Sequence, residues 1–185
     1  MDATFKRSAR MLLVLLMLFI TSGVQAYDTL LLELGIAEGD ADAEKIGFQA
    51  RFALPYTWLA TQKWQLESYL EAGVSYWDGE KGTSGHKDLF DFSITPIARL
   101  QRTQSATIWP FVEVGFGVHI HTADGIGDEN FDIPFAFGTH IGMGFRIGAN
   151  RNYEIMYKFR HLSNADIGDD NPGINFHNLQ FGYHF

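Results

Sequence analysis

Two stretches of the chain alternate, with few exceptions, between apolar residues and a mixed set of small and polar or charged residues, and this period of two most limits how the chain can fold. In PFVEVGFGVHIH, residues 110–121, nearly every second residue is valine, phenylalanine or isoleucine, and FGTHIGMGFRI, residues 137–147, repeats the pattern. Successive side chains on a strand point to opposite faces. Both stretches are therefore predicted to be strands with one apolar face.

The other face of these strands holds glycines beside charged groups, among them Glu113, His140 and Arg146. A secreted soluble β-sandwich would turn such a face to water, where glycine only weakens a strand. A narrow barrel filled by polar side chains needs small residues on its inner face, and its apolar face then meets lipid. The pattern favours the membrane barrel, with the soluble sandwich as the alternative.

Eight segments of this kind can be counted, and about 9 to 11 residues suffice for a tilted strand to cross a bilayer. They cover residues 27–37, 44–54, 62–77, 89–101, 107–121, 135–147, 152–163 and 175–185. The predicted fold is all-β: an eight-stranded antiparallel transmembrane outer-membrane β-barrel that occupies residues 27–185 as one domain.

Residues 1–26 have the composition of a secretory signal peptide. Three basic residues precede an apolar run of ten residues, 11–20, and small residues lead to Ala26, where cleavage is predicted. An uncleaved anchor is the alternative, but a spanning helix needs about 20 residues. The formal charge of −8 argues against nucleic acid as a partner, and the absence of cysteine excludes disulfides and Cys-ligated metals.

The connections between the segments alternate in character. AEGDADA, DGEKGTSGHKD, TADGIGDENFDIP and NADIGDDNPGI are acidic and glycine-rich, whereas RTQSA and GANR are short and carry basic residues. Outer-membrane barrels have short periplasmic turns and longer outer loops. Both termini are therefore expected in the periplasm. The alternating aromatic end at Phe185 resembles the C-terminal insertion signal of bacterial outer-membrane barrels, which predicts an outer-membrane location.

Near the chain end, polar residues fall on the face that otherwise holds apolar ones. Tyr153, Ile155, Tyr157 and Phe159 mark the lipid side of segment 152–163, and the period of two places His161 and Ser163 on the same side. The same rule places Asn175 and His177 outward on the last segment, where an antiparallel hairpin brings Asn175 close to His161. A polar patch is thus expected at the level of the outer leaflet, where polar groups facing hydrocarbon cost free energy.

This patch has the groups needed for acyl transfer. His161 can act as general base to the hydroxyl of Ser163, and Asn175 can orient the imidazole by accepting from its N–H. Asn164, or backbone N–H groups of the following loop, can supply an oxyanion hole. The alternative is an interfacial histidine and serine that only contact lipid headgroups.

The sequence HLSNADIGDDNPGIN, residues 161–175, resembles the signature of the lipid A 3-O-deacylases of the PagL type. The resemblance implies an eight-stranded outer-membrane esterase that removes an ester-linked 3-hydroxyacyl chain from lipid A of lipopolysaccharide. It implies Ser163 as nucleophile, His161 as base and Asn164 as an oxyanion contributor. The best-known members have glutamate where this chain has Asn175, and often glycine where it has Asp166. Asp166 and His177 are less favoured substitutes for that carboxylate.

Two function classes stay open from the sequence. The lipid-facing polar patch favours the deacylase, and asparagine at the acid position favours a non-enzymatic small barrel of structural or adhesive role. A palmitoyl-transferring barrel is less favoured, because no amphipathic helix precedes the first strand. The expected partners are lipid A and outer-membrane lipid, the active site facing the outer leaflet; a homodimer is left open.

Three further histidines, His119, His121 and His140, alternate with apolar positions and are expected inside the barrel. Their expected role is an interior hydrogen-bond network, and a metal site among them is the less favoured alternative. No cofactor is predicted, and the favoured interpretation of the sequence has no metal site.

Overall fold

The computed structural model describes residues 28–39, 42–104 and 107–185, and the predicted signal peptide, residues 1–26, lies outside them. The described residues form ten strands: β1 Thr29–Glu38, β2 Glu44–Ala60, β3 Trp64–Asp78, β4 Asp88–Arg102, β5 Ile108–His121, β6 Gly125–Ile126, β7 Glu129–Asn130, β8 Phe135–Ile147, β9 Tyr153–Ser163 and β10 Ile174–His184. Within these ranges there is no helix whose length and apolarity would take it through a membrane.

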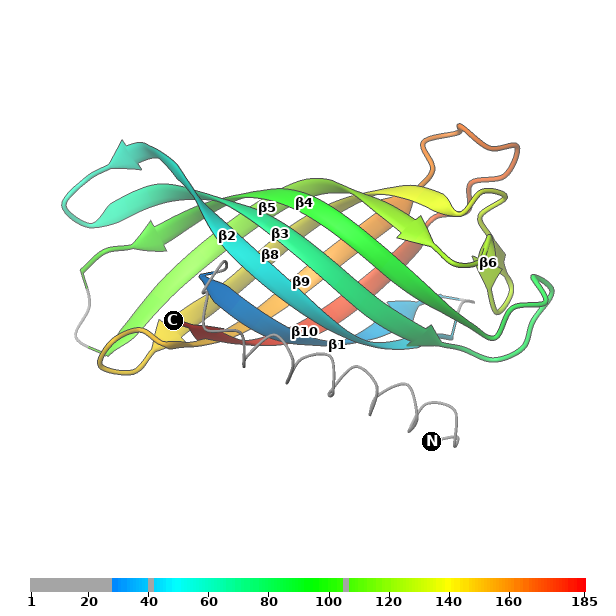
Figure 1. The fold of residues 1–185 in the computed structure, drawn as a ribbon, viewed down its shortest axis with the longest axis horizontal. Coiled ribbons are helices and arrows are strands. Elements are labelled where there is room, and N and C mark those ends of the chain that lie inside the picture. Colours follow the sequence, from blue (N-terminus) through cyan, green and yellow to red (C-terminus); the bar gives the residue numbers. More distant parts are fainter. Residues whose placement is uncertain (1–27, 40–41, 105–106) are drawn as a thin grey trace.

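Eight of the strands close into an antiparallel barrel in the order β1-β10-β9-β8-β5-β4-β3-β2 (Figure 1). This confirms the predicted fold class, and each predicted segment coincides with one barrel strand. The largest difference is at β2, which continues to Ala60 instead of ending at residue 54. The short β6–β7 hairpin, in the connection between β5 and β8, was not predicted.

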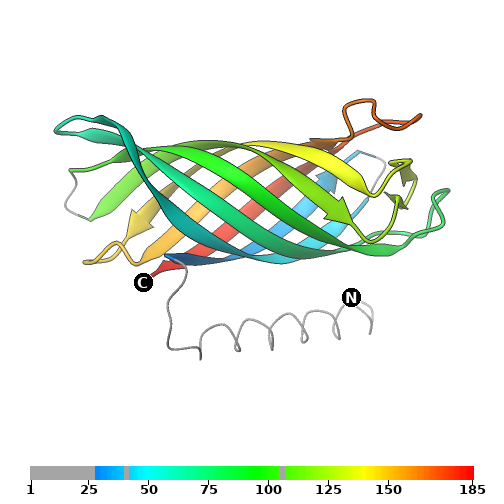
Figure 2. The same ribbon diagram turned by 45° about the horizontal axis from the view of Figure 1, so that its top comes forward.

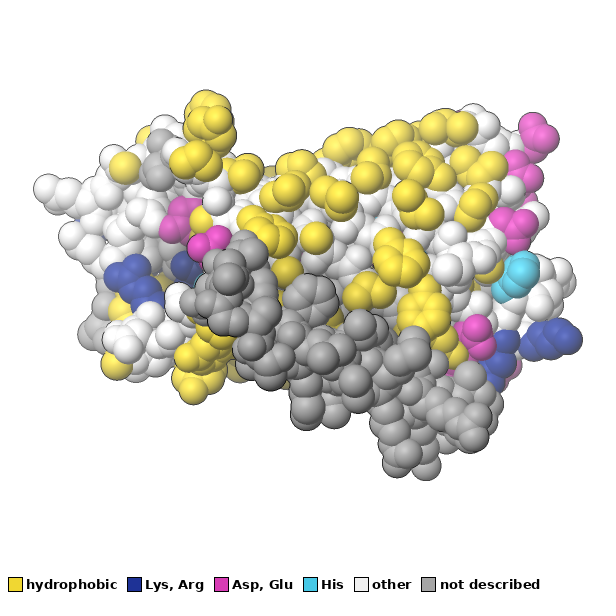
Figure 3. Space-filling model, in the orientation of Figure 1, with side chains coloured by type: hydrophobic (Ala, Val, Ile, Leu, Met, Phe, Trp, Pro, Cys, Tyr) yellow, Lys and Arg dark blue, Asp and Glu magenta, His cyan; other side chains and the backbone are white. Residues whose placement is uncertain are grey.

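The two faces of each strand follow the predicted alternation. In β5, Phe111 and Glu113 are buried while Val112 and Val114 are exposed. The exposed apolar side chains form a hydrophobic band around the visible side of the barrel, between two more polar ends (Figure 3). Such a band is the surface that hydrocarbon covers in an outer-membrane barrel.

The interior is polar and closely packed. The buried charged residues of the described chain are Glu33, Glu71, Asp91, Glu113, Glu154, Lys45, Arg51, Arg99, Lys158 and Arg160. Arg99 donates to Glu154 (Nη1–Oε2 2.6 Å) and to Glu113 (Nε–Oε2 2.9 Å). The predicted use of glycine is confirmed at Gly115, where a Cβ would lie 2.3 Å from Cε1 of His140. Large polar side chains fit inside the barrel because some of the residues that face them are glycines, which have no side chain.

The two ends of the barrel differ. The short turns and both ends of the described barrel lie together, with the N–H of Phe185 donating to the carbonyl of Asp28 at 3.1 Å (Figure 2). The long connections lie at the opposite end. There a buried apolar cluster closes the interior, and we call it the outer cap: Ala43, Trp77, Leu89, Ile126, Phe131, Ala136, Leu162, Ile174 and Phe176.

Candidate active site on the lipid-facing side of β9 and β10

The last two barrel strands carry the predicted site residues on their outer face. His161 is exposed, Ser163 is half-buried, and Leu162 between them is buried in the outer cap. On β10, Asn175 is half-buried while its neighbours Ile174 and Phe176 are buried. The predicted parity of both strands is confirmed, since the polar patch sits on the side that holds tyrosine, isoleucine and phenylalanine further along.

His161 and Asn175 are direct partners across the two strands. Nδ1 of His161 lies 2.8 Å from Oδ1 of Asn175. An amide oxygen can only accept, so Nδ1 carries a proton in this contact, and in the neutral ring the free lone pair is then on Nε2. Nε2 is the nitrogen that a general base would use.

Ser163 lies on the same face as His161, two residues further along β9, and pairs with Phe137 of β8. Its hydroxyl makes no hydrogen bond with a described residue, so the Ser163–His161 contact is not closed in this structure. Same-face neighbours on a strand are about 6.6–6.8 Å apart at the backbone. Catalytic hydrogen bonds are often long or poorly aligned before substrate binds, so the open Ser163–His161 contact is compatible with a general base acting on this hydroxyl.

Asn164 does not have the freedom that its predicted oxyanion role requires. It is buried, its Nδ2 donates to the carbonyls of Phe131 (2.9 Å) and Asp170 (2.7 Å), and its backbone N–H donates to Asn171 Oδ1 (2.9 Å). Both amide hydrogens are therefore committed to holding the loop. The next residue, Ala165, has a positive φ of 56°, and its N–H has no acceptor among the described residues.

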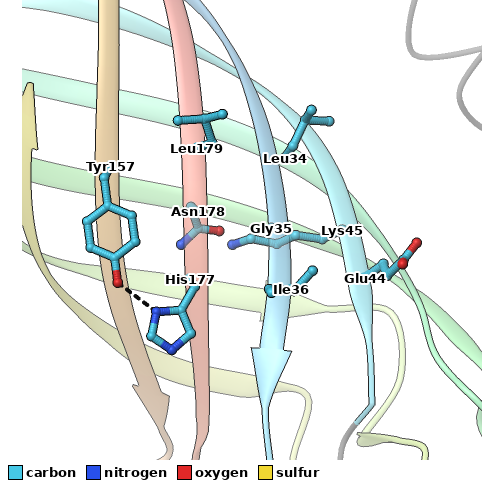
Figure 4. Close-up of a pocket in the computed structure, with 9 residues that line it drawn as sticks. All are labelled: Leu34, Gly35, Ile36, Glu44, Lys45, Tyr157, His177, Asn178 and Leu179. Carbon is cyan, nitrogen blue, oxygen red and sulfur yellow. Dashed lines mark hydrogen bonds between the residues drawn. The ribbon is translucent and has the colours of Figure 1, made fainter.

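The two alternative partners of His161 are engaged elsewhere. Asp166 Oδ1 accepts from Asn171 Nδ2 at 2.9 Å, within the loop. His177 faces outward as predicted, but its Nδ1 lies 2.6 Å from the hydroxyl of Tyr157 (Figure 4). Of the three candidates considered from the sequence, Asn175 is the one that contacts His161.

Gly173 is a site residue that the sequence analysis missed. It has a φ of +69°, and a Cβ there would lie 3.0 Å from Cε1 of His161 and 3.2 Å from the carbonyl oxygen of Leu162. The glycine thus lets the loop return close over the imidazole. Its signal in the sequence is the turn dipeptide Pro172–Gly173 just before β10, whose proximity to His161 follows only from the strand pairing.

A shallow groove lies on the same outer wall. It is lined by Leu34, Gly35, Ile36, Glu44, Lys45, Tyr157, His177, Asn178 and Leu179, which come from β1, β2, β9 and β10 (Figure 4). A Cβ at Gly35 would meet Asn178 Oδ1 and the Lys45 side chain at 2.4–2.8 Å, so glycine at this inward-facing position leaves room for those two buried side chains. His177 lies two residues after Asn175 on the same outward face of β10, so the groove begins beside the polar patch.

Comparisons with known proteins agree with this geometry. A family model described as Lipid A 3-O-deacylase (PagL) matches residues 44–184. Lipid A deacylase PagL of Bordetella bronchiseptica is 31% identical over 117 residues, which cover 62% of this chain and 61% of that relative. Lipid A deacylase PagL of Pseudomonas aeruginosa is 28% identical over 123 residues, which cover 66% of this chain and 68% of that relative.

The fold has a solved counterpart. The crystal structure of the outer membrane enzyme PagL superposes with a TM-score of 0.76 at 23% identity, and the alignment covers 85% of this chain and 99% of that chain. This likeness concerns the fold, and it agrees with the closed barrel and its lipid-facing band. Because the family model spans most of the barrel, the chain belongs to the lipid A 3-O-deacylase (PagL) family, whose members are outer-membrane β-barrels.

Proposed function

We propose that this protein is an outer-membrane esterase that removes the ester-linked 3-hydroxyacyl chain from the 3-O position of lipid A. The observation that carries the proposal is the His161–Asn175 hydrogen bond on the lipid-facing side of the barrel, with Ser163 beside it. A purely structural barrel has no use for a polar patch in this row. Family membership and the names of the curated relatives support the same activity.

In the proposed mechanism, Nε2 of His161 accepts the proton of the Ser163 hydroxyl as Oγ attacks the ester carbonyl. The tetrahedral intermediate collapses when the C–O bond to the sugar breaks, and the imidazolium returns the proton to the sugar oxygen. Water, activated by the same imidazole, then hydrolyses the acyl-serine. The products are a free 3-hydroxy fatty acid and lipid A with a free hydroxyl.

Asn175 is proposed to hold the imidazole in the Nδ1–H tautomer. A neutral amide orients the ring as a carboxylate would, but it stabilises the imidazolium less. The N–H of Ala165 is proposed as an oxyanion donor, because it follows the nucleophile closely and has no acceptor among the described residues. The side chain of Asn164 then acts by holding the loop that presents this N–H.

The groove beside His177 is proposed to hold an acyl chain of the substrate. Its apolar wall consists of Leu34, Ile36 and Leu179, all of which are exposed on the lipid side. A chain lying there would run along the outer wall of the barrel, with its carboxyl end near Ser163. No cofactor takes part in this chemistry.

Mass spectrometry of lipid A from cells with and without this protein tests the proposal. Cells that make the protein should show lipid A lighter by one 3-hydroxyacyl chain, and fragmentation should place the loss at the 3-O position. Lipid A of unchanged mass under all growth conditions would favour the non-enzymatic barrel instead.

A further inference from the structure

The buried carboxylates inside the barrel are not all neutralised in the same way. Glu33, Glu71, Glu113 and Glu154 each lie within 3.0 Å of a lysine or arginine nitrogen. Asp91 is 1% exposed, and among the described residues its ion-pair partners are His119 and His121 alone. Burying a carboxylate without a cation in contact is unfavourable, so the charge of Asp91 favours a cationic partner.

The three side chains form a compact set of metal-ligating atoms. Asp91 Oδ1 lies 2.9 Å from His119 Nδ1 and 3.4 Å from His121 Nε2, and one ligand atom from each residue falls within 4.8 Å of the others. Ligands about 2.1 Å from a tetrahedral zinc ion lie roughly 3.4 Å apart. The cluster therefore needs only small side-chain rotations to surround an ion.

His121 supplies the second observation that points to a ligand. It is 5% exposed, and neither of its ring nitrogens makes a hydrogen bond with a described residue. Its ring packs against Trp77 and Phe131, with centroid distances of 5.1 and 5.5 Å. A buried imidazole with both nitrogens unsatisfied is costly, and its Nε2 points toward Asp91.

We propose that Asp91, His119 and His121 bind a divalent first-row transition metal, of which Zn²⁺ fits the two-imidazole, one-carboxylate set best, with the fourth tetrahedral position left to water. The ion replaces the proton that His119 Nδ1 shares with Asp91, and that proton is released to solvent. The ion also gives His121 a partner and neutralises the carboxylate.

The surroundings of Asp91 support this assignment. The Ser75 hydroxyl donates to Asp91 Oδ2 at 3.2 Å and accepts from Trp77 Nε1 at 2.8 Å. These two hydrogen bonds fix the orientation of the carboxylate. A Cβ at Gly138 would lie 2.4 Å from Nε2 of His119, so glycine there leaves the imidazole its place. Of the cations nearby, Lys45 pairs with Glu33, and Arg160 pairs with Glu33 and Glu71; neither forms an ion pair with Asp91 among the described residues.

The site lies beneath the outer cap and differs from the esterase patch in position and role. Phe131, which packs on His121, also accepts the Asn164 hydrogen bond that holds the loop after Ser163. A metal ion here would therefore stiffen the outer end of the barrel without touching the substrate. Its expected role is structural.

The test is to refold the full-length protein in detergent with Zn²⁺, wash it with a chelator to strip exposed sites, and measure bound zinc by elemental analysis. Wild type should retain about one zinc ion per chain, and its thermal unfolding midpoint should be higher than after refolding with chelator. His121→Gln and Asp91→Asn should each retain less than about a tenth as much and lose the midpoint shift.

His140→Gln is the matched control, because His140 is also buried inside the barrel but lies near Glu113 (Nε2–Oε1 3.5 Å) and outside the cluster. It should bind zinc as wild type does. The proposal is wrong if wild type refolded with Zn²⁺ retains no zinc, or if His121→Gln retains as much zinc as wild type. In either case protonated histidines neutralise Asp91. Equal loss in His140→Gln would also overturn the assignment. A heat-dependent shift in electrophoretic mobility shows which variants have folded. Where Asp91→Asn does not fold, the zinc content of His121→Gln is sufficient to test the proposal.

Discussion

The barrel has two groups of polar side chains that differ in which way they face. Inside, arginines, lysines and glutamates are fully buried and compensate one another, as Arg99 does between Glu113 and Glu154. Outside, His161, Ser163 and Asn175 sit among apolar neighbours on the lipid side, and only one hydrogen bond joins them. The inner group fills the barrel and stabilises it, whereas the outer group leaves an imidazole nitrogen and a hydroxyl free to react.

Mutations in the two groups should therefore affect different properties of the protein, activity in one case and stability in the other. Changes in the outer group should remove activity and leave stability intact, because those side chains add few contacts. Changes in the inner group should lower stability and leave the chemistry of folded protein nearly intact, because Leu162 and its neighbours in the outer cap separate the interior from the site.

The largest effect is expected for Ser163→Ala. Without the hydroxyl that is proposed as nucleophile, deacylation should fall by at least about 1,000-fold. The free energy of unfolding should change by less than about 0.5 kcal/mol, because Ser163 is half-buried and its hydroxyl has no partner among the described residues. Purified protein assayed on lipid A in detergent, with a parallel denaturant titration, checks both. Retained activity would remove Ser163 from the mechanism.

Next in size is Arg99→Ala. Arg99 is buried and contacts Glu113 and Glu154, so its removal leaves two buried carboxylates short of a partner and should lower the free energy of unfolding by about 3–5 kcal/mol. The activity of the folded fraction should stay within about twofold of wild type. Arg102→Ala is the matched control, because Arg102 is exposed on the same strand. Equal unfolding curves for the two variants would contradict the stabilising role of the inner group.

A smaller effect is expected at Asn175, where the chain departs from the best-known family members. Asn175→Ala should lower the rate severalfold to about 100-fold, because His161 then loses the acceptor that holds its Nδ1–H. Asn175→Glu should keep or raise activity, since a carboxylate holds the same tautomer and adds charge stabilisation. Full activity in Asn175→Ala would place the orienting group elsewhere.

The smallest effect is expected for His177→Phe. This change keeps a ring in the groove and removes the hydrogen bond to Tyr157, so activity should fall by no more than about threefold, mainly through a higher KM. Steady-state kinetics on the same substrate would measure it. A loss as large as that of Asn175→Ala would show that His177 takes part in the catalytic step.

The alternation of the sequence was sufficient to predict the barrel, the outward and inward faces of its strands, and the proximity of His161 to Asn175. A period of two fixes which side each residue faces, and the antiparallel pairing of two consecutive segments places His161 opposite Asn175 across the loop 164–173. Both rules use neighbouring segments of the chain and can be applied without knowing the rest of the fold.

Features that depend on distant loops could not be predicted in this way. Asn164 is held by the carbonyl of Phe131, 33 residues away in the chain, so its commitment to the loop is invisible in the local sequence. Gly173 matters because the loop returns over His161, and Asp91 meets His119 and His121 only through the register of β4 and β5. Loop packing and side-chain rotamers, rather than periodicity, decide these contacts.

The most direct test of the central claim, that the lipid-facing patch is an esterase site, is covalent labelling with an alkyl fluorophosphonate. An activated serine displaces fluoride and forms an Oγ–P bond, so wild type should gain one adduct on the tryptic peptide 161–185, in which Ser163 is the single serine. The adduct should be absent from Ser163→Ala and strongly reduced in His161→Ala. An unlabelled wild type, or an adduct on a serine elsewhere in the chain, would contradict the account.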